Sequence, residues 1–163
     1  MLALKNILVA TDFSEPSGVA LAYGRDLARS YNARLHVLHV VEDVMMRYSS
    51  ELGFAQPDLQ GELEETARRE LNALMTADDR GTLTIVTVVQ SGVNIAEAVV
   101  KYAKEKDIDL IVTGTHGRGA VKHFLMGSVA ERVVRTAPCP VLTVRAHERD
   151  FLAPDAMVCS VSA

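Results

Sequence analysis

Residues 109–119 read DLIVTGTHGRG, and residues 127–136 read GSVAERVVRT. The first stretch is an aliphatic run followed by three closely spaced glycines, which predicts a buried strand over 109–113 and a tight loop after it. The second begins with a Gly-Ser pair and continues with apolar residues at helical spacing, which predicts a helix over 128–136. A strand, a glycine-rich loop and a helix in this order are typical of α/β proteins.

The remainder of the chain repeats this alternation of strand-like and amphipathic stretches. Residues 5–11, KNILVAT, are apolar almost throughout, as expected of a strand that is buried on both faces. Alternating strands and helices imply right-handed crossovers, and hence one open, mainly parallel, Rossmann-like sheet with helices on both faces. We therefore predict a single α/β domain over residues 1–146 and a C-terminal tail over 147–163. The predicted strands are 5–11, 34–41, 82–89, 109–113 and 140–145, and the predicted helices run from Ser14 to about 31 and over 58–77, 94–106 and 128–136.

Two local patterns concern packing and not catalysis. Glu64 and Arg68 lie four residues apart on the charged side of the helix predicted over 58–77, where they can form an ion pair. His36 and His39 lie three residues apart in a predicted strand, so they point to opposite faces, cannot bind one metal ion together, and are expected to be structural. The inward side of the helix is predicted to consist of Leu59, Leu63, Ala67, Leu71 and Leu74.

The composition excludes several classes of function. The chain has 163 residues and a net charge of −4, so it presents no overall positive field that would attract nucleic acid or an anionic membrane. No apolar run approaches the roughly 20 residues needed to cross a bilayer, and the first residues lack a charged leader. Cys139 and Cys159, without a CxxC spacing, suggest neither a disulfide framework nor a zinc site. We expect a cytoplasmic protein without membrane insertion.

The loop that begins at Gly114 has the composition of a phosphate-binding site. Glycines let backbone N–H groups approach phosphate oxygens, because no Cβ stands in the way. Gly127 and Ser128, at the start of a helix, add unpaired N–H donors and the positive end of the helix dipole. Neither a GxxxxGK[ST] motif nor a GxGxxG motif after the first strand is present. Glycines in such places also mark tight turns and helix caps, and this alternative stays open.

Three stretches together resemble the universal stress protein family. They are the spacing Gly-x-x-Gly-x9-Gly-Ser from Gly114 to Ser128, the stretch VATDFS from Val9, and the stretch CPVLTVR that ends at Arg145. The resemblance covers residues 3 to about 146 and implies the strand order 3-2-1-4-5. In that order, strands one and four are neighbours, so the end of strand one lies beside the glycine loop. In family members that bind ATP, these two places hold the nucleotide.

The resemblance implies a set of binding residues in this chain. Asp12 resembles the residue that accepts hydrogen bonds from the ribose hydroxyls, and Val40 the residue whose backbone meets the adenine edge. Ala130 stands where nucleotide-binding relatives often have a hydroxyl residue, which removes one possible phosphate donor. The expected cofactor is ATP, with Mg²⁺. The implied binding residues are Ala10, Thr11, Asp12, Val40, Thr113, Gly114, Gly117, Arg118, Gly127, Ser128 and Val129.

The predicted function is that of an ATP-binding regulatory or sensing module, whose nucleotide occupancy changes the surface offered to a partner. A slow ATPase is the alternative, with Asp12, His116 and Arg118 as candidates. No dedicated general base stands out, so no catalytic residue is assigned and enzymatic activity is left open. A phosphorylation-dependent receiver domain is set aside, because the third predicted strand ends in Val88-Val89-Gln90 and not in an acceptor aspartate.

The last predicted strand suggests a partner. Residues Val141 to Val144 carry no charge and would lie at an edge of the sheet, where unpaired backbone groups favour pairing with another strand. The family resemblance implies a homodimer in which these strands pair antiparallel across a two-fold axis. We therefore expect a homodimer, while a regulatory protein partner is not identified.

Overall fold

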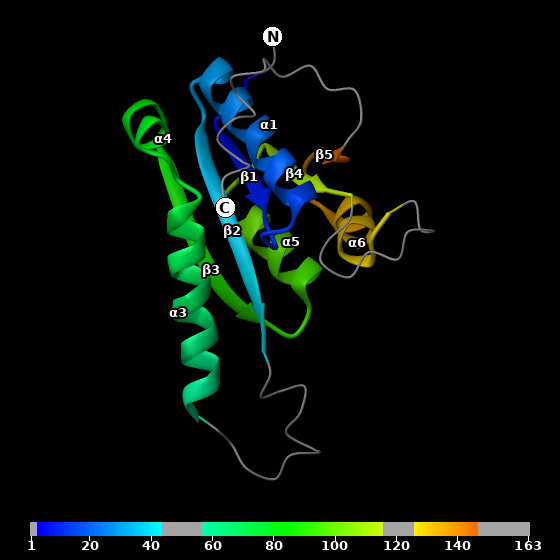
Figure 1. Cartoon of the computed structure of the whole chain (residues 1–163). Helices are drawn as coiled ribbons and strands as arrows, with labels where there is room; N and C mark the ends of the chain where they lie inside the picture. The colour runs from blue at the N-terminus through cyan, green and yellow to red at the C-terminus, as the bar shows by residue number, and fades with distance from the viewer. Residues whose placement is uncertain (1–2, 44–56, 116–125, 147–163) are drawn as a thin grey trace.

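The computed structural model describes residues 3–43, 57–115 and 126–146. Within these ranges the chain alternates strands and helices (Figure 1). Among the described helices, none combines the length and the apolarity that crossing a membrane would need. In chain order the elements are β1 (Asn6–Ala10), α1 (Glu15–Tyr31), β2 (Arg34–Glu42), α3 (Pro57–Ala73), α4 (Ala77–Thr82), β3 (Ile85–Gly92), α5 (Ile95–Glu105), β4 (Leu110–Gly114), α6 (Ser128–Thr136) and β5 (Val141–Val144).

The strands form one parallel sheet in the order β3-β2-β1-β4-β5. This is the order that the resemblance implies, with β1 at the centre. Ala10, the last residue of β1, pairs with Leu38 of β2 on one side and with Thr113 of β4 on the other. The carboxyl ends of β1 and β4 therefore lie side by side, although much of the chain separates them in sequence.

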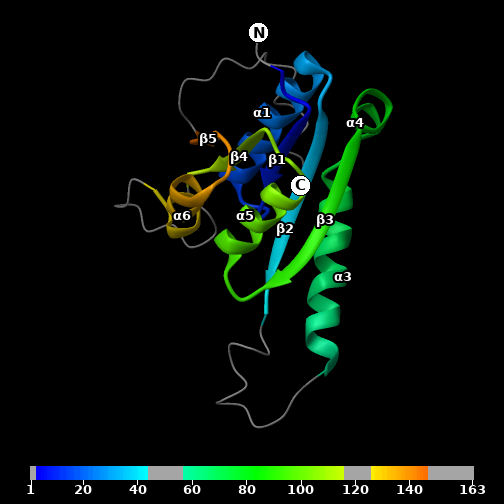
Figure 2. The ribbon, with the colours of Figure 1, turned by 180° about the vertical axis from the view of Figure 1, so that it is seen from behind.

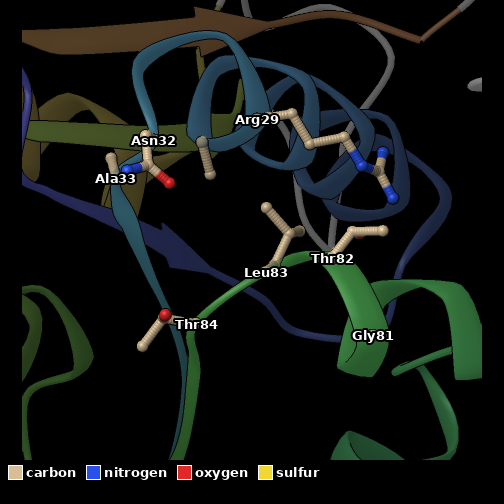
Figure 3. Close-up of a pocket in the computed structure, with 8 residues that line it drawn as sticks. Arg29, Asn32, Ala33, Gly81, Thr82, Leu83 and Thr84 are labelled. Carbon is tan, nitrogen blue, oxygen red and sulfur yellow. The ribbon is translucent and has the colours of Figure 1, made fainter.

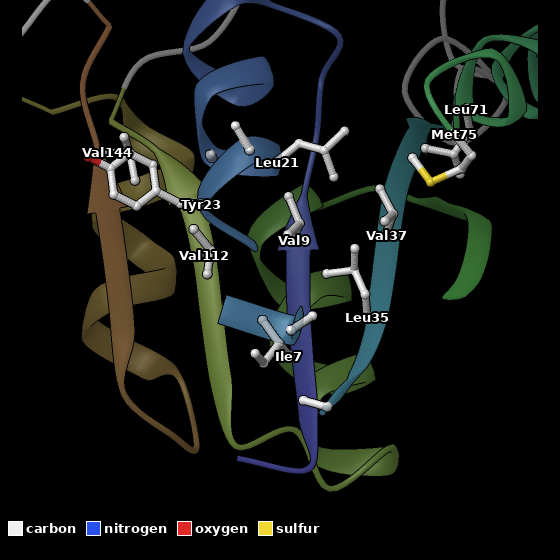
Figure 4. Close-up of a cluster of buried hydrophobic side chains, with 14 residues drawn as sticks. Ile7, Val9, Leu21, Tyr23, Leu35, Val37, Leu71, Met75, Val112 and Val144 are labelled. Atoms are coloured by element: carbon white, nitrogen blue, oxygen red, sulfur yellow. The ribbon is translucent and has the colours of Figure 1, made fainter. Parts of the chain in front are cut away.

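Both faces of the sheet are apolar, because successive residues of the central strands point to opposite sides. Ile7 and Val9 of β1 pack with Val112 and Leu71 in a core beneath α1 and α3 (Figure 4). Leu8, between them, packs on the other face with residues of α5 and α6. Figures 1 and 2 show these two helical layers from opposite sides. The near-continuous apolar runs of the sequence follow from this double burial.

The prediction of one helix over 58–77 and a strand over 82–89 is wrong between residues 74 and 84. α3 ends earlier than predicted and a separate short helix, α4, follows it. Thr76 and Asp79 form a capping box, in which each side chain accepts a hydrogen bond from the other residue's backbone N–H. This reciprocal pair starts a new helix, because it satisfies two N–H groups that a first turn leaves unpaired. β3 consequently begins and ends later than predicted.

Two residues predicted for the inward side of α3 are not buried. Leu59 is 41% exposed and Leu63 is 38% exposed, whereas the later positions of the same stripe pack on the core. At this end of α3, polar groups contact the sheet instead, since Ser91 near the end of β3 donates a hydrogen bond to Glu64 at 2.6 Å. Glu64 also forms the predicted ion pair with Arg68, at 3.0 Å.

α4 is joined to α1 by a buried ion pair that the sequence analysis did not anticipate. Arg25 of α1 lies 2.9 Å from the carboxylate of Asp79, and their side chains are 4% and 1% exposed. The guanidinium of Arg25 also donates to the Leu74 carbonyl. Arg29, one turn further along α1, bonds to the other oxygen of Asp79 at 3.0 Å and to Asp78 at 2.8 Å. Asp79 therefore caps its own helix and holds that helix against α1.

The two histidines of β2 lie on opposite faces of the sheet, as their spacing predicts. His39 is on the face covered by α1. His36 is on the other face, where its Nδ1 lies 2.8 Å from the hydroxyl of Tyr102 in α5. His36 is 5% exposed, and its buried Nε2 has no hydrogen-bond partner among the described residues. Burial lowers the pKa of His36, and the positive charges of Arg34 and Lys106 lower it further.

The protein is expected to lose stability as the pH falls below about 6.5, because the unfolded chain then takes up a proton that folded His36 resists. Above about 6.5, His36 is neutral in both states and its contribution to stability is complete. Below that value, the contribution is lost progressively as the pH approaches the lowered pKa of the folded state. His36→Asn should reduce the slope of the free energy of unfolding against pH by at most about 1.4 kcal/mol per pH unit.

The measurement is urea unfolding of both proteins over a pH series from slightly alkaline to mildly acidic. Asparagine is the appropriate replacement, because its amide can still bond to the Tyr102 hydroxyl but does not titrate. Equal pH slopes for the two proteins would contradict the assignment to His36.

Candidate functional site

The residue that follows β4 joins the carboxyl end of this strand to the start of α6 by backbone hydrogen bonds. The N–H of Thr115 donates to the carbonyl of Val144 at 2.9 Å, which continues the β4–β5 pairing by one step. The carbonyl of Thr115 in turn accepts a hydrogen bond from the N–H of Gly127 at 2.7 Å. Thr115 thus brings the start of α6 to the carboxyl ends of the neighbouring strands β1 and β4. Open α/β sheets bind their ligands at this place, where the strand order reverses.

Gly114 has a packing role at this edge. A Cβ built on it would lie 2.9 Å from the carbonyl carbon and the Cβ of Pro16, in the first turn of α1. No side chain fits at that separation, so glycine lets α1 approach the end of β4. Close packing therefore accounts for this glycine by itself, whether or not it also contacts a ligand.

The start of α6 offers backbone donors. Gly127 is the N-cap residue and has no side chain with which to cap the helix. Its own N–H donates to the Thr115 carbonyl, so the prediction that Gly127 adds an unpaired N–H donor is wrong. The N–H groups of a first helical turn have no acceptor within the helix, and they lie at the positive end of the helix dipole. Ser128 and Val129 are exposed here, whereas Ala130 is buried. An anionic group of a ligand suits this place, and the hydroxyl of Ser128 adds a further donor.

The turn that follows β1 is closed by its own hydrogen bonds. Oδ1 of Asp12 accepts from the backbone N–H of Ser14 at 3.1 Å and from the Ser14 hydroxyl. Ser14 is the N-cap residue of α1, but its hydroxyl bonds to Asp12 and does not cap the helix. Asp12 is therefore held in one orientation at the carboxyl end of the central strand.

Thr11 anchors the same turn. Its backbone N–H donates to the carbonyl of Leu38 at 3.0 Å, which extends the pairing of β1 with β2. Its hydroxyl lies 3.0 Å from that of Ser17 and accepts from the N–H of Phe13 at 3.1 Å. The Ser17 hydroxyl donates to the Ser14 carbonyl at 2.8 Å, so the Thr11 hydroxyl is the donor to Ser17.

Val40 and Thr113 lie on the two strands that flank β1. Val40 is 6% exposed, near the carboxyl end of β2, and its backbone pairs with that of Gln90 in β3. Thr113 is 8% exposed, and its backbone pairs with that of Ala10. The sheet thus brings Ala10, Thr11, Asp12, Val40, Thr113 and Gly114 to one edge, together with Gly127, Ser128 and Val129 through the Thr115 hydrogen bonds. Gly117, Arg118 and His116 lie outside the described residues, and their part in the site stays a prediction.

Ser17, Thr115 and His39 contribute to this edge, although the sequence analysis did not assign them to it. Ser17 is buried at 3% and Thr115 at 4% exposure, which is unusual for hydroxyl residues. Thr115 stands within the glycine-rich stretch itself, so its position was a usable signal. Ser17 offered none, because a serine in a first helical turn is commonplace.

A shallow pocket of about 280 Å³ lies elsewhere (Figure 3). It is formed where α1 ends and β3 is about to begin, which is the amino-terminal edge of the sheet. Ligands of parallel sheets bind at the opposite edge, so this pocket is separate from the candidate site. A second pocket, of about 480 Å³, lies between the end of β3 and the start of α5, and its wall includes Gly92.

An open, doubly wound parallel sheet with a candidate ligand site at its switch point defines a single-domain α/β protein of the Rossmann-like class. The sequence model of the universal stress protein family matches residues 3–145. The chain belongs to the universal stress protein family.

Individual relatives agree with this assignment. A putative universal stress protein of Staphylococcus haemolyticus is 35% identical over 153 residues, which cover 91% of this chain and 88% of that protein. A universal stress protein of Methanocaldococcus jannaschii is 31% identical, with 90% and 85% covered. The solved structure of the universal stress protein UspA from Lactobacillus plantarum superposes with a TM-score of 0.71 at 26% identity, covering 89% of this chain and all of that one.

Two solved structures share the fold at lower identity and carry ligands. A universal stress protein in complex with cAMP matches with a TM-score of 0.57 at 24% identity, covering 88% of this chain and 98% of that one. The universal stress protein from Archaeoglobus fulgidus in complex with dAMP matches with a TM-score of 0.61 at 18% identity, covering 88% and 99%.

Proposed function

We propose that this protein binds ATP, with Mg²⁺, at the carboxyl edge of β1 and β4, and that it serves as a regulatory or sensing module. The observation that carries the proposal is the junction made by Thr115, which brings the start of α6 to the edge where Asp12 is held. One side of this edge offers a fixed carboxylate and the other offers backbone N–H donors. A nucleotide needs acceptors for its ribose hydroxyls and donors for its phosphates, and it needs both close together.

Each part of the nucleotide has a place in this proposal. The ribose hydroxyls donate to Asp12, and the phosphates lie against Gly127, Ser128 and the first-turn N–H groups of α6. The backbone near Val40 meets the edge of the adenine. The proteins crystallised with cAMP and dAMP support the proposal to the extent that the same fold accommodates an adenine nucleotide.

Regulation is favoured over hydrolysis by the state of Asp12. A general base must reach the attacking water beside the terminal phosphate, whereas Asp12 is held by Ser14 and is assigned here to the ribose hydroxyls. The segments 44–56 and 116–125 follow β2 and β4 directly at this edge. We propose that the regulatory output passes through these segments, since a bound nucleotide would contact the places where they begin.

ATP with Mg²⁺, at a hundred times its dissociation constant, is expected to stabilise the protein by about 2.7 kcal/mol. At about 2–4 °C per kcal/mol for a chain of this size, the melting temperature should rise by roughly 5–10 °C. Asp12→Ala and Gly127→Val should each abolish most of the shift. Asp78→Ala removes an exposed carboxylate at the amino-terminal ends of the strands, away from the candidate site, and should leave the temperature shift intact.

Two results would overturn the proposed function together. One is the absence of a shift with millimolar ATP and Mg²⁺, and the other is the absence of any nucleotide released when the purified protein is denatured. Phosphate release that Asp12→Ala abolishes would instead identify the protein as a slow ATPase.

We expect the protein to form a homodimer in which the outer edge of β5, the side away from β4, pairs with β5 of a second chain. The N–H of Ile111 donates to the carbonyl of Pro140, and the N–H of Thr115 donates to the carbonyl of Val144. The backbone groups of the even-numbered residues around β5 therefore point toward β4. In a parallel pair, alternate residues turn the same way, so the backbone groups of Val141 and Thr143 face the free edge. These groups, and the apolar side chains beside them, suit an antiparallel partner strand.

Thr143→Pro is the matching test, because it removes one outward N–H without removing a bond to β4. In sedimentation equilibrium, the wild-type protein should have twice the chain mass of 17.7 kDa, whereas the variant should have the mass of one chain. A wild-type monomer at micromolar concentration would contradict the dimer.

A further inference from the structure

The turn between β1 and α1 contains an unfavourable backbone conformation. Phe13 has a φ of 63°, in the left-handed region that an aromatic residue seldom adopts. Strain of this kind persists only where surrounding contacts hold it, and such places cluster at binding sites. Phe13 follows Asp12 directly, so whatever holds Phe13 also determines where the carboxylate of Asp12 lies.

His39 of β2 supplies two of the contacts that hold this turn. Its ring lies against that of Phe13, with 4.4 Å between the ring centroids and 34° between the planes. Its Nδ1 lies 2.8 Å from the backbone carbonyl of Thr11. A carbonyl oxygen can only accept, so Nδ1 carries the proton and donates it to Thr11.

This hydrogen bond fixes the peptide that joins Thr11 to Asp12. The N–H of Thr11 is already bonded to Leu38, and its hydroxyl to Ser17 and to the N–H of Phe13. The bond from His39 engages the remaining polar group of Thr11, its carbonyl. Because both the N–H and the carbonyl of Thr11 are hydrogen-bonded, the Thr11–Asp12 peptide is held in one orientation. That orientation determines the direction in which the side chain of Asp12 leaves the backbone.

We propose that His39 is a positioning residue for the nucleotide site: it holds the Thr11–Asp12 peptide and the ring of Phe13, so that Asp12 is preorganised for the ribose before the nucleotide arrives. The inference rests on the proposed function and identifies a residue that determines the affinity for the nucleotide. His39 acts on the opposite face of β2 from Val40, so it acts through Asp12 and not by touching the adenine edge. Preorganisation raises affinity because less conformational freedom is lost on binding.

Two replacements of His39 separate positioning from packing. His39→Leu fills the space but removes the donor, whereas His39→Asn places an amide N–H near the position of Nδ1 and so keeps it. The matched control is His36→Asn, which alters the other histidine of β2 on the opposite face. Affinity for ATP with Mg²⁺ is measured by isothermal titration calorimetry, well below the melting temperature of each variant.

His39→Leu is expected to weaken ATP binding about tenfold, the size of one lost hydrogen bond, while His39→Asn stays within about threefold of the wild type. His36→Asn should leave the affinity unchanged even where it lowers stability. In the protein without nucleotide, His39→Leu should speed hydrogen exchange at the amides of Phe13 and Ser14 about tenfold, because both amides donate within the turn.

The outcomes distinguish this inference from the proposed function. If the wild-type protein binds no adenine nucleotide, the proposed function fails, and the exchange experiment still decides whether His39 holds the turn. If the wild-type protein binds ATP and His39→Leu binds it equally well, the positioning role is overturned. Equal weakening by His39→Leu and His39→Asn would also overturn it, since the donor would then be irrelevant.

Discussion

Asp79→Ala is expected to lower the free energy of unfolding by about 3–5 kcal/mol, because it leaves the buried guanidinium of Arg25 without its counter-ion. The side chain of Arg25 is 4% exposed, so water does not replace the lost carboxylate. The remaining bond to the Leu74 carbonyl does not neutralise the charge. The same substitution removes the carboxylate that accepts the N–H of Thr76, so α4 also loses one of the two hydrogen bonds of its capping box.

Asp78→Ala is the control for this prediction. Asp78 precedes Asp79 in sequence and bonds to Arg29 at 2.8 Å, but its side chain is 68% exposed. Solvent screens such a pair, so its removal should cost no more than about 1 kcal/mol. Chemical denaturation with linear extrapolation measures both free energies. If the two variants lose the same amount, burial of the Arg25–Asp79 pair does not hold α4 to α1.

Gly24→Ala is expected to destabilise the protein although alanine is the better helix former. A Cβ on Gly24 would lie 2.3 Å from a methyl carbon of Val9, in the fully buried centre of β1. Valine is stiff about its first side-chain torsion, so the methyl cannot swing away and α1 must shift. Overpacking of this kind costs about 1–3 kcal/mol, and the gain in helix propensity offsets about 1 kcal/mol of that.

Gly18→Ala gives the matched comparison within the same helix. Beyond the adjoining backbone of α1 itself, no atom of the described residues lies within 4 Å of a Cβ placed on Gly18, so only the propensity term remains. This variant should be more stable than the wild type by about 0.5–1 kcal/mol. The two alanine substitutions in α1 should therefore change the midpoint of denaturation in opposite directions. A stabilised Gly24→Ala variant would show that α1 is free to move on β1.

Much of the fold could be predicted because its signals are local. The aliphatic runs of β1 and β2 identify buried strands wherever they stand, and alternation with amphipathic stretches leads to a parallel sheet. α4 was missed because Ala77–Thr82 is short and contains Gly81, so its composition argues against a helix. The capping box at Thr76 was present in the sequence, but a box before six residues is a weak signal by itself.

The candidate site was predictable in part. The glycine loop with Gly127 and Ser128 was predicted from its composition and its place before a helix, whereas Asp12 was named because it matches a family pattern. His39 was assigned a structural role, since its position in a strand indicates only the face on which it lies. Its bond to Thr11 depends on β1 and β2 being neighbours in one particular register.

Most strands and helices, and the inward-facing residues of the strands, could be predicted because they follow from spacings of a few residues. The short helix α4 and the exposed start of α3 could not. Which polar and small residues meet depends on how distant segments pack. In the sequence, Arg25 is one of several charged residues of an amphipathic helix. Only the structure shows that it lies 2.9 Å from the carboxylate of Asp79. The packing roles of Gly24 and Gly114 appear only in the structure, because Val9 and Pro16 occupy the space that a side chain at these positions would need. Such contacts join residues far apart in the chain, so no local pattern contains them.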